Sequence, residues 1–375
     1  MKTVKVILAA LLAAQLLAAC SDGEIQMTTT INRNGSCQRM VTFAADSAAL
    51  VGSYDASAPM AHLLSDSAWD KTWCIKDDTA RHAYPMTLEQ YSEVRASLPK
   101  DCSSDTLQIC AERRFASVEE MGGTPLLMLG DKPLMAQVSL KKRFRWFYTD
   151  YVFEETYPIQ GQLFSYPLSK FVEDDVASYW FTGEPDLMQG HSPAEKKETD
   201  DMIEEQCDRW LVANYVAEAF DAVADGYDSL PDMPMAKSVY LTHRDSLIDY
   251  ALNCQFTFGD NIDTLFSGYF HSQAYERAFA SSKIEQQLDA KLDDFVDLME
   301  LKVDYRLVLP GTIRDAGNGV LEQGAVRYRL TGNRLIPHDY TLAATSRATN
   351  IWAFIITALI LLGVIVGIKK KKTIE

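Results

Sequence analysis

The chain has 375 residues and carries 52 Asp and Glu against 36 Lys and Arg, which gives a formal net charge of −16. Such an acidic surface repels phosphate backbones and anionic lipid headgroups, so nucleic-acid binding is excluded. The hydrophobic fraction of 47% is that of a folded protein and excludes a disordered stalk.

The first twenty residues predict export and lipidation. Lys2 and Lys5 precede an apolar stretch, residues 6–17, that is too short to span a bilayer but has the length of a signal peptide. The motif Leu17-Ala18-Ala19-Cys20 then resembles the lipobox of bacterial lipoproteins. In that family the thiol at the position of Cys20 receives the diacylglycerol anchor.

The other six cysteines predict disulfides, because their number is even and an exported protein meets an oxidising compartment. Cys102 and Cys110 are close in sequence and form the first expected pair. Helical segments carry Cys207 and Cys254, and Cys37 with Cys74 is the remaining combination. Buried free thiols are the alternative. No spacing of His or Cys indicates a metal site, so we expect neither a metal nor a cofactor.

Local patterns then predict a β-rich first half. Residues 24–43 alternate around Asn34-Gly35 and predict a hairpin. Thr87 and Gln90 form a capping box that starts a helix over residues 87–98, and residues 101–110 read as a loop. Residues 136–157 predict one long strand that is rich in aromatic side chains. These aromatics indicate a buried core, with an aromatic platform for a sugar or lipid as the alternative: Phe144, Trp146, Phe147, Tyr148, Tyr151, Phe153 and Tyr157.

The hydrophobic period becomes helical between residues 167 and 300 and returns to strands after it. We expect helices over residues 168–181, 202–224, 236–253, 261–280 and 284–299, and a loop at residues 189–197. Strands are expected over residues 303–309, 325–330 and 340–344. The predicted fold is α+β: an antiparallel sheet from N- and C-terminal strands with an inserted helical subdomain.

The last third contains LVLPGTIRDAGNG, GAVRYRL and SRATN, and it resembles the end of LppM-type envelope lipoproteins. That resemblance implies an exported β-rich domain that engages envelope lipids or glycolipids, and it implies no catalytic residue.

Residues 348–368 carry no charge and are followed by Lys369, Lys370, Lys371 and Lys372. Their length predicts a transmembrane helix, and the lysines place its end in the cytoplasm. The expected organisation is therefore a signal peptide (1–19), a β-rich half (20–166), a helical insert (167–300), completing strands (301–347), the membrane helix (348–368) and a basic tail (369–375).

No nucleotide-binding or nucleophile motif occurs. Glu154 and Glu155 are carboxylates on the aromatic strand, but adjacent strand residues face opposite sides, so they cannot act together. We therefore expect a non-enzymatic lipoprotein of the bacterial inner membrane, with a binding, scaffold or envelope-assembly role. An enzyme on envelope lipid or glycan and a sensory subunit are the alternatives.

The expected partners are the membrane, an envelope protein and a lipid or glycan ligand. The anchors at the two ends predict that one sheet edge, carrying the first and last strands, faces the membrane, while the acidic helical insert projects away.

Overall fold

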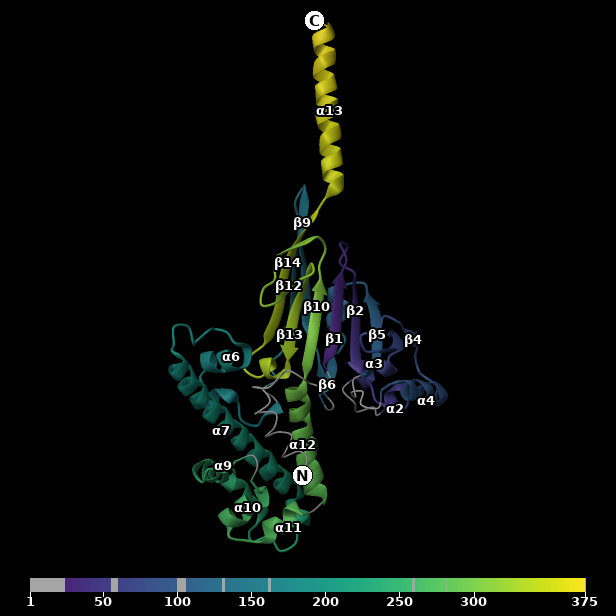
Figure 1. The fold of residues 1–375 in the computed structure, drawn as a ribbon. Coiled ribbons are helices and arrows are strands. Elements are labelled where there is room, and N and C mark those ends of the chain that lie inside the picture. The colour runs from purple at the N-terminus through teal and green to yellow at the C-terminus, as the bar shows by residue number, and fades with distance from the viewer. Residues whose placement is uncertain are drawn as a thin grey trace.

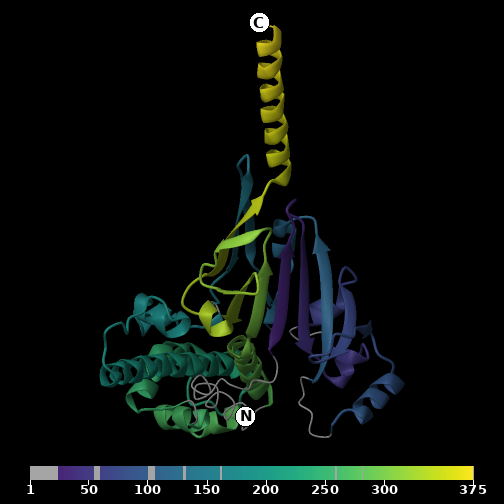
Figure 2. The same ribbon diagram turned by 45° about the horizontal axis from the view of Figure 1, so that its top comes forward.

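The computed structural model describes residues 24–54, 60–99, 106–129, 132–160, 163–257, 260–280 and 282–374. Two β-sheets form its middle, a group of helices covers one end, and a single long helix leaves the other end (Figures 1 and 2). The α+β fold and the helical insert between strands are thus confirmed.

The larger sheet has eight strands and joins the two ends of the chain. The predicted hairpin is present, with Gly35 at φ +98° in its turn. The strands run in the order β12 (Val320–Glu322), β13 (Ala325–Thr331), β10 (Lys302–Val308), β1 (Ile25–Ile31), β2 (Cys37–Ala44), β5 (Leu107–Phe115), β3 (Asp70–Ile75) and β4 (His82–Ala83). Because β1 and β10 pair in parallel, this sheet is mixed, and the prediction of one antiparallel sheet is wrong in that respect.

A second sheet of four antiparallel strands contains β11 (Thr312–Asp315), β14 (Tyr340–Thr349), β9 (Tyr148–Tyr157) and β8 (Gln137–Phe144). The short strands β6 (Leu127–Leu129) and β7 (Lys132–Leu134) pair separately. The predicted single strand over residues 136–157 is wrong, because residues 145–147 form a turn that separates β8 from β9.

The two sheets enclose a core that contains one buried charged pair. Glu155 on β9 accepts hydrogen bonds from Arg39 Nη2 at 2.7 Å, from the Tyr157 hydroxyl at 2.8 Å and from the Tyr305 hydroxyl at 2.6 Å. Arg39 Nε donates to the Thr29 hydroxyl at 3.1 Å. Burial disfavours the charge of Arg39, but the Glu155 carboxylate outweighs this effect, and the pKa of Arg39 is raised. The pair ties strands β1, β2, β9 and β10 together.

The helical insert has its own apolar core, and its longest helix also packs against the sheets. Trp210 Nε1 donates to the Tyr166 carbonyl at 2.8 Å, just before the insert. The predicted loop over residues 189–197 ends early, because the Ser192 capping box with Glu195 starts the long helix at Pro193. The elements are the 3₁₀-helix Leu168–Lys170, α6 (Asp174–Thr182), α7 (Pro193–Gly226), α8 (Lys237–Tyr240), α9 (Arg244–Asn253), α10 (Ile262–Phe270), α11 (Ala274–Phe279) and α12 (Ser282–Glu300).

Small helices complete the domain. The capping box of Thr87 and Gln90 is confirmed at the start of α4, whereas part of the predicted loop at residues 101–110 belongs to β5. These helices are α2 (Ser47–Leu50), α3 (Ala61–Ser65), α4 (Leu88–Ser97) and α5 (Val118–Gly122), with a 3₁₀-helix at Gly332–Leu335.

The first strand and the last helix lie at opposite ends of the sheets. Ile25 pairs with Val303, which follows α12, so β1 begins beside the insert. The last helix, α13 (Ile351–Ile374), leaves from the far end (Figure 1). Strands β1 and β14 are each flanked on both sides and belong to different sheets, so the prediction of a shared membrane-facing edge is wrong.

Candidate functional site

The base of α13 is held by the turn between β8 and β9. The buried residue Asn350 joins the two: its backbone N–H donates to the Phe147 carbonyl at 2.9 Å, and its Nδ2 donates to the Arg145 carbonyl at 2.8 Å. The Thr149 hydroxyl donates to Asn350 Oδ1 at 3.2 Å. Four polar contacts, including one to the Trp146 carbonyl, thus set where and in which direction the helix starts.

Aromatic side chains extend this contact along the helix. The ring centroids of Phe144 and Trp146 lie 6.2 Å and 5.3 Å from that of Trp352, and Phe147 lies 4.7 Å from Phe354. Trp146 Nε1 also donates to the hydroxyl of Thr357, about 9 Å into the helix at 1.5 Å per residue. The rings of Phe144, Trp146, Phe147 and Trp352 are 40–60% exposed, so they form a surface rather than a core.

Beyond this base, α13 exposes apolar side chains around its whole circumference. Twelve large apolar residues between positions 351 and 366 are at least 40% exposed, and none of the sixteen residues in this stretch is charged. A helix that is apolar on every side is normally buried. The twelve are Ile351, Trp352, Phe354, Ile355, Ile356, Leu359, Ile360, Leu361, Leu362, Val364, Ile365 and Val366.

Within the residues that the structure describes, however, no helix is both long and apolar enough to cross a membrane. Ala348 and Thr349 belong to β14, so the first two positions of the expected span are not helical. For the described residues, the prediction of a transmembrane helix over residues 348–368 is therefore wrong.

Basic side chains surround the turn between β8 and β9 and its aromatic rings. Lys141, Lys142, Arg143 and Arg145 are all exposed on β8 and its turn. Nearby, Arg33 Nη1 donates to the Thr349 carbonyl at 3.2 Å.

Arg347 stacks over the Tyr148 ring at 3.8 Å and pairs with Asp150 at 2.7 Å, and this hydrogen-bonded pair lowers the pKa of Asp150. The only other described carboxylate paired with this group is that of Glu154, 3.4 Å from Lys141 Nζ. Within the described residues, these six cations therefore have two carboxylates at ion-pair distance.

The opposite end has the opposite charge. Residues 167–300 contain 28 Asp and Glu against 9 Lys and Arg, a charge of −19, so the remainder of the chain is at +3. The net charge of −16 therefore comes from the helical insert, whereas the exposed Lys141, Lys142, Arg143 and Arg145 make the end that carries α13 locally basic.

The five described cysteines are all free thiols. Cys37 and Cys74 lie on β2 and β3, which β5 separates, so this predicted pair is wrong. Cys207 in α7 and Cys254 at the end of α9 are both free, so that predicted pair is wrong too. Burial raises the pKa of the Cys207 thiol to about 12. Cys110 is buried in β5.

The lipidation site and the basic tail are not placed. Cys20 and Cys102 lie outside the described residues, as do the side chains of Lys369, Lys370, Lys371 and Lys372. Lipidation at Cys20 and the Cys102 pair stay predictions.

The two carboxylates of the aromatic strand lie apart. Glu154 faces solvent and Glu155 lies fully buried in the core, which agrees with their expected placement on opposite faces. No group of three or more His, Cys, Asp or Glu side chains that could hold a metal occurs among the described residues.

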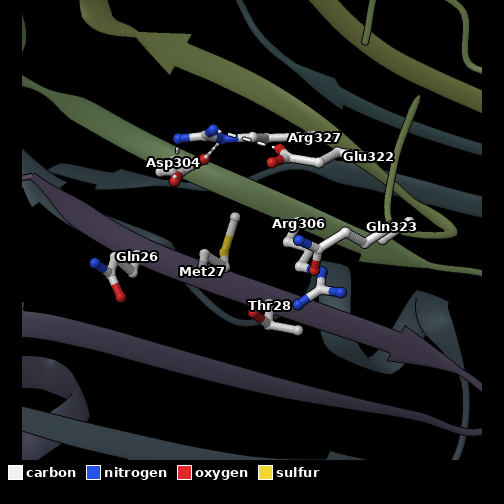
Figure 3. Close-up of a pocket in the computed structure, with 9 residues that line it drawn as sticks. Gln26, Met27, Thr28, Asp304, Arg306, Glu322, Gln323 and Arg327 are labelled. Carbon is white, nitrogen blue, oxygen red and sulfur yellow. Dashed lines mark hydrogen bonds and ion pairs between the residues drawn. The ribbon is translucent and has the colours of Figure 1, made fainter. Parts of the chain in front are cut away.

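Two hollows on the described surface are large enough for a small molecule. One, of about 360 Å³, lies on the solvent face of the larger sheet between β1, β10 and the β12–β13 hairpin (Figure 3). Its Arg327 is engaged by Asp304 at 2.7 Å and by Glu322 at 3.4 Å. The other, of about 670 Å³, lies between the end of α6 and the start of β14 and includes His338 and Asp339. Neither combines apolar walls with converging polar groups, as small-molecule sites usually do.

The sequence interpretation identified the aromatic side chains but not the site. Tyr151, Phe153 and Tyr157 are core, whereas Phe144, Trp146 and Phe147 are exposed at the end of β8 and in the turn after it. The available signal was the run of residues 141–147, KKRFRWF, which interleaves four cations with three aromatics in an acidic chain.

No family model, no curated protein and no solved structure matches this chain.

Proposed function

We propose that this protein is an exported lipoprotein that attaches to the bacterial inner membrane and acts without catalysis, as a binding, scaffold or envelope-assembly factor. The observation that carries this proposal is the exposure of twelve large apolar side chains on α13. Monomeric soluble proteins rarely expose so large an apolar surface without a partner. Burying the exposed halves of twelve such side chains is worth on the order of 10 kcal/mol.

Three further features support lipid as the partner. Trp146 and Trp352 lie at the base of α13, where amphipathic rings favour the interface between water and hydrocarbon. The predicted lipid at Cys20 and the resemblance to LppM-type lipoproteins point to the same compartment. In this arrangement the domain stands on the exported side, with the acidic insert turned toward other proteins of the envelope.

Charged substitutions in α13 test the attachment. In a Cys20→Ala background, which removes the predicted lipid, the combined change Leu359→Asp and Leu362→Asp should release the protein from membranes that have been washed with carbonate. Each carboxylate costs about 2.5–3.5 kcal/mol in hydrocarbon. Leu88→Asp on α4, where the side chain is 72% exposed, is the matched control and should leave the protein attached. Retention of the α13 variant would refute the proposal.

A further inference from the structure

Residues 141–147, at the end of β8 and in the turn after it, are named the basic turn here. This segment presents its charges to whatever surrounds α13. It contains Lys141, Lys142, Arg143 and Arg145, interleaved with three exposed aromatic rings. Lys141 has the Glu154 carboxylate at 3.4 Å, and Lys142 Nζ donates to the Asn34 carbonyl. Within the described residues, no carboxylate lies within the 4.0 Å of an ion pair from Arg143 or Arg145.

The turn also lies at a defined depth relative to the apolar surface. Trp146 reaches Thr357, so the turn runs beside the first 9 Å or so of α13. The headgroup layer of one leaflet is about 5–8 Å thick. Burial of the apolar part of α13 therefore brings Arg143 and Arg145 to the level of the headgroups, with their aromatic neighbours beside the hydrocarbon.

Charge complementarity identifies the headgroups. Six cations lie around the base of α13, and two carboxylates pair with them. The helical insert at the other end of the domain carries a charge of −19. An anionic surface attracts the basic end, repels the insert and so orients the molecule. A neutral, zwitterionic surface offers neither effect. We propose that the basic turn binds the headgroups of anionic phospholipids. This inference rests on the proposed membrane attachment and names the lipid class that the same surface selects.

A competition between two vesicle populations measures this selection. The full chain is diluted from detergent into an equal mixture of buoyant phosphatidylcholine vesicles and dense, sucrose-loaded vesicles that contain phosphatidylglycerol as well. The ratio of bound protein gives the preference directly. Each Lys or Arg near an anionic surface contributes about 1 kcal/mol, so the combined change Arg143→Gln and Arg145→Gln should reduce the preference about thirtyfold.

The matched control removes the same charge elsewhere. Arg306 and Arg329 are exposed on the solvent face of the larger sheet, and their combined change to Gln should leave the preference intact. Raising the salt concentration should lower the wild-type preference, because exposed charges are screened. Inorganic phosphate at the same phosphate concentration should not displace the protein.

Distinct outcomes separate the two proposals. If the wild type binds both populations equally, or if the turn variant matches the control variant, headgroup recognition is overturned while membrane attachment stands. If inorganic phosphate displaces the protein, the basic turn is a phosphate site and the assignment to lipid is overturned. If the wild type binds neither population, membrane attachment itself fails, and this inference fails with it.

Discussion

Removal of the charge of Glu155 should destabilise the fold far more than removal of the charge of the adjacent Glu154. Arg39 and Glu155 are 4% and 0% exposed, and their 2.7 Å contact joins the two sheets. The change Glu155→Gln leaves the Arg39 guanidinium buried without a counter-ion. Breaking a buried pair in this way costs about 3–5 kcal/mol. That is a large part of the roughly 5–15 kcal/mol by which folded proteins are stable.

The matched control is Glu154→Gln on the same strand, because the ion pair of Glu154 with Lys141 is exposed to solvent. Exposed pairs contribute at most about 1 kcal/mol. Urea unfolding of the full chain in detergent micelles, followed by tryptophan fluorescence, compares the two variants. Equal midpoints for them would refute the assignment of Arg39 and Glu155 as the polar centre of the core.

An apolar replacement of the whole group separates the charge effect from loss of packing. The combined change Arg39→Met, Glu155→Leu, Tyr157→Phe and Tyr305→Phe removes the hydroxyls that would otherwise lose their acceptor. Such replacements are often neutral or stabilising, so most of the loss should be recovered. A quadruple variant as unstable as Glu155→Gln would show that packing, and not the unpaired charge, causes the loss.

Three further predictions concern other parts of the fold. Gly332→Ala should lower the free energy of unfolding by about 1–3 kcal/mol or more, because the added Cβ would lie 1.6 Å from the Leu298 carbonyl oxygen. Gly268→Ala in α10 is the control and should be neutral or stabilising in the same urea titration. Maleimide should label Cys254 in the native protein and the buried thiols only after unfolding; early labelling of Cys207 would contradict the packing of α7. Burial and nearby carboxylates raise the pKa of Asp297 to about 6, so the folded state holds its proton more tightly and stability falls as pH rises from about 4 to 6. Asp297→Asn should therefore stabilise the protein at pH 7, by about 1 kcal/mol once solvent screening is allowed for, and not at pH 4.

Local signals predicted the fold best. The Asn34-Gly35 hairpin and the Thr87 capping box were correct because each depends on a few adjacent residues. The parallel pairing of β1 with β10 joins residues almost 280 positions apart, and no local pattern encodes it. The turn after Phe144 was missed because it contains neither Gly nor Pro and is held by the distant residue Asn350.

The site was less predictable than the fold for a related reason. An apolar run at residues 351–366 was evident, but its relation to the aromatic turn depends on the pairing of β9 with β14. The cysteines were misassigned because an even count says nothing of distance. In the structure, strands and helices carry Cys37, Cys74, Cys207 and Cys254 to separate places.

The positions of β1 and α13 also limit how the two predicted anchors can act together. Along β1, Ile25 to Ile31 covers about 20 Å. The far end of β1 is level with Arg347, since Thr30 pairs with Val308 and the nearby Gly311 packs directly on the Arg347 carbonyl.

From Arg347 to the start of α13 at Ile351 the chain rises about another 13 Å. Ile25 and the base of α13 are therefore separated by roughly 30 Å along the sheets, even after allowance for their twist. The five residues from Cys20 to Ile25 span at most about 17 Å when fully extended. While β1 stays paired and the turn holds α13 upright, a lipid on Cys20 therefore cannot enter the bilayer surface at the base of α13. If both proposed anchors exist, they act at opposite ends of the domain, and α13 attaches its own end without help from the lipid.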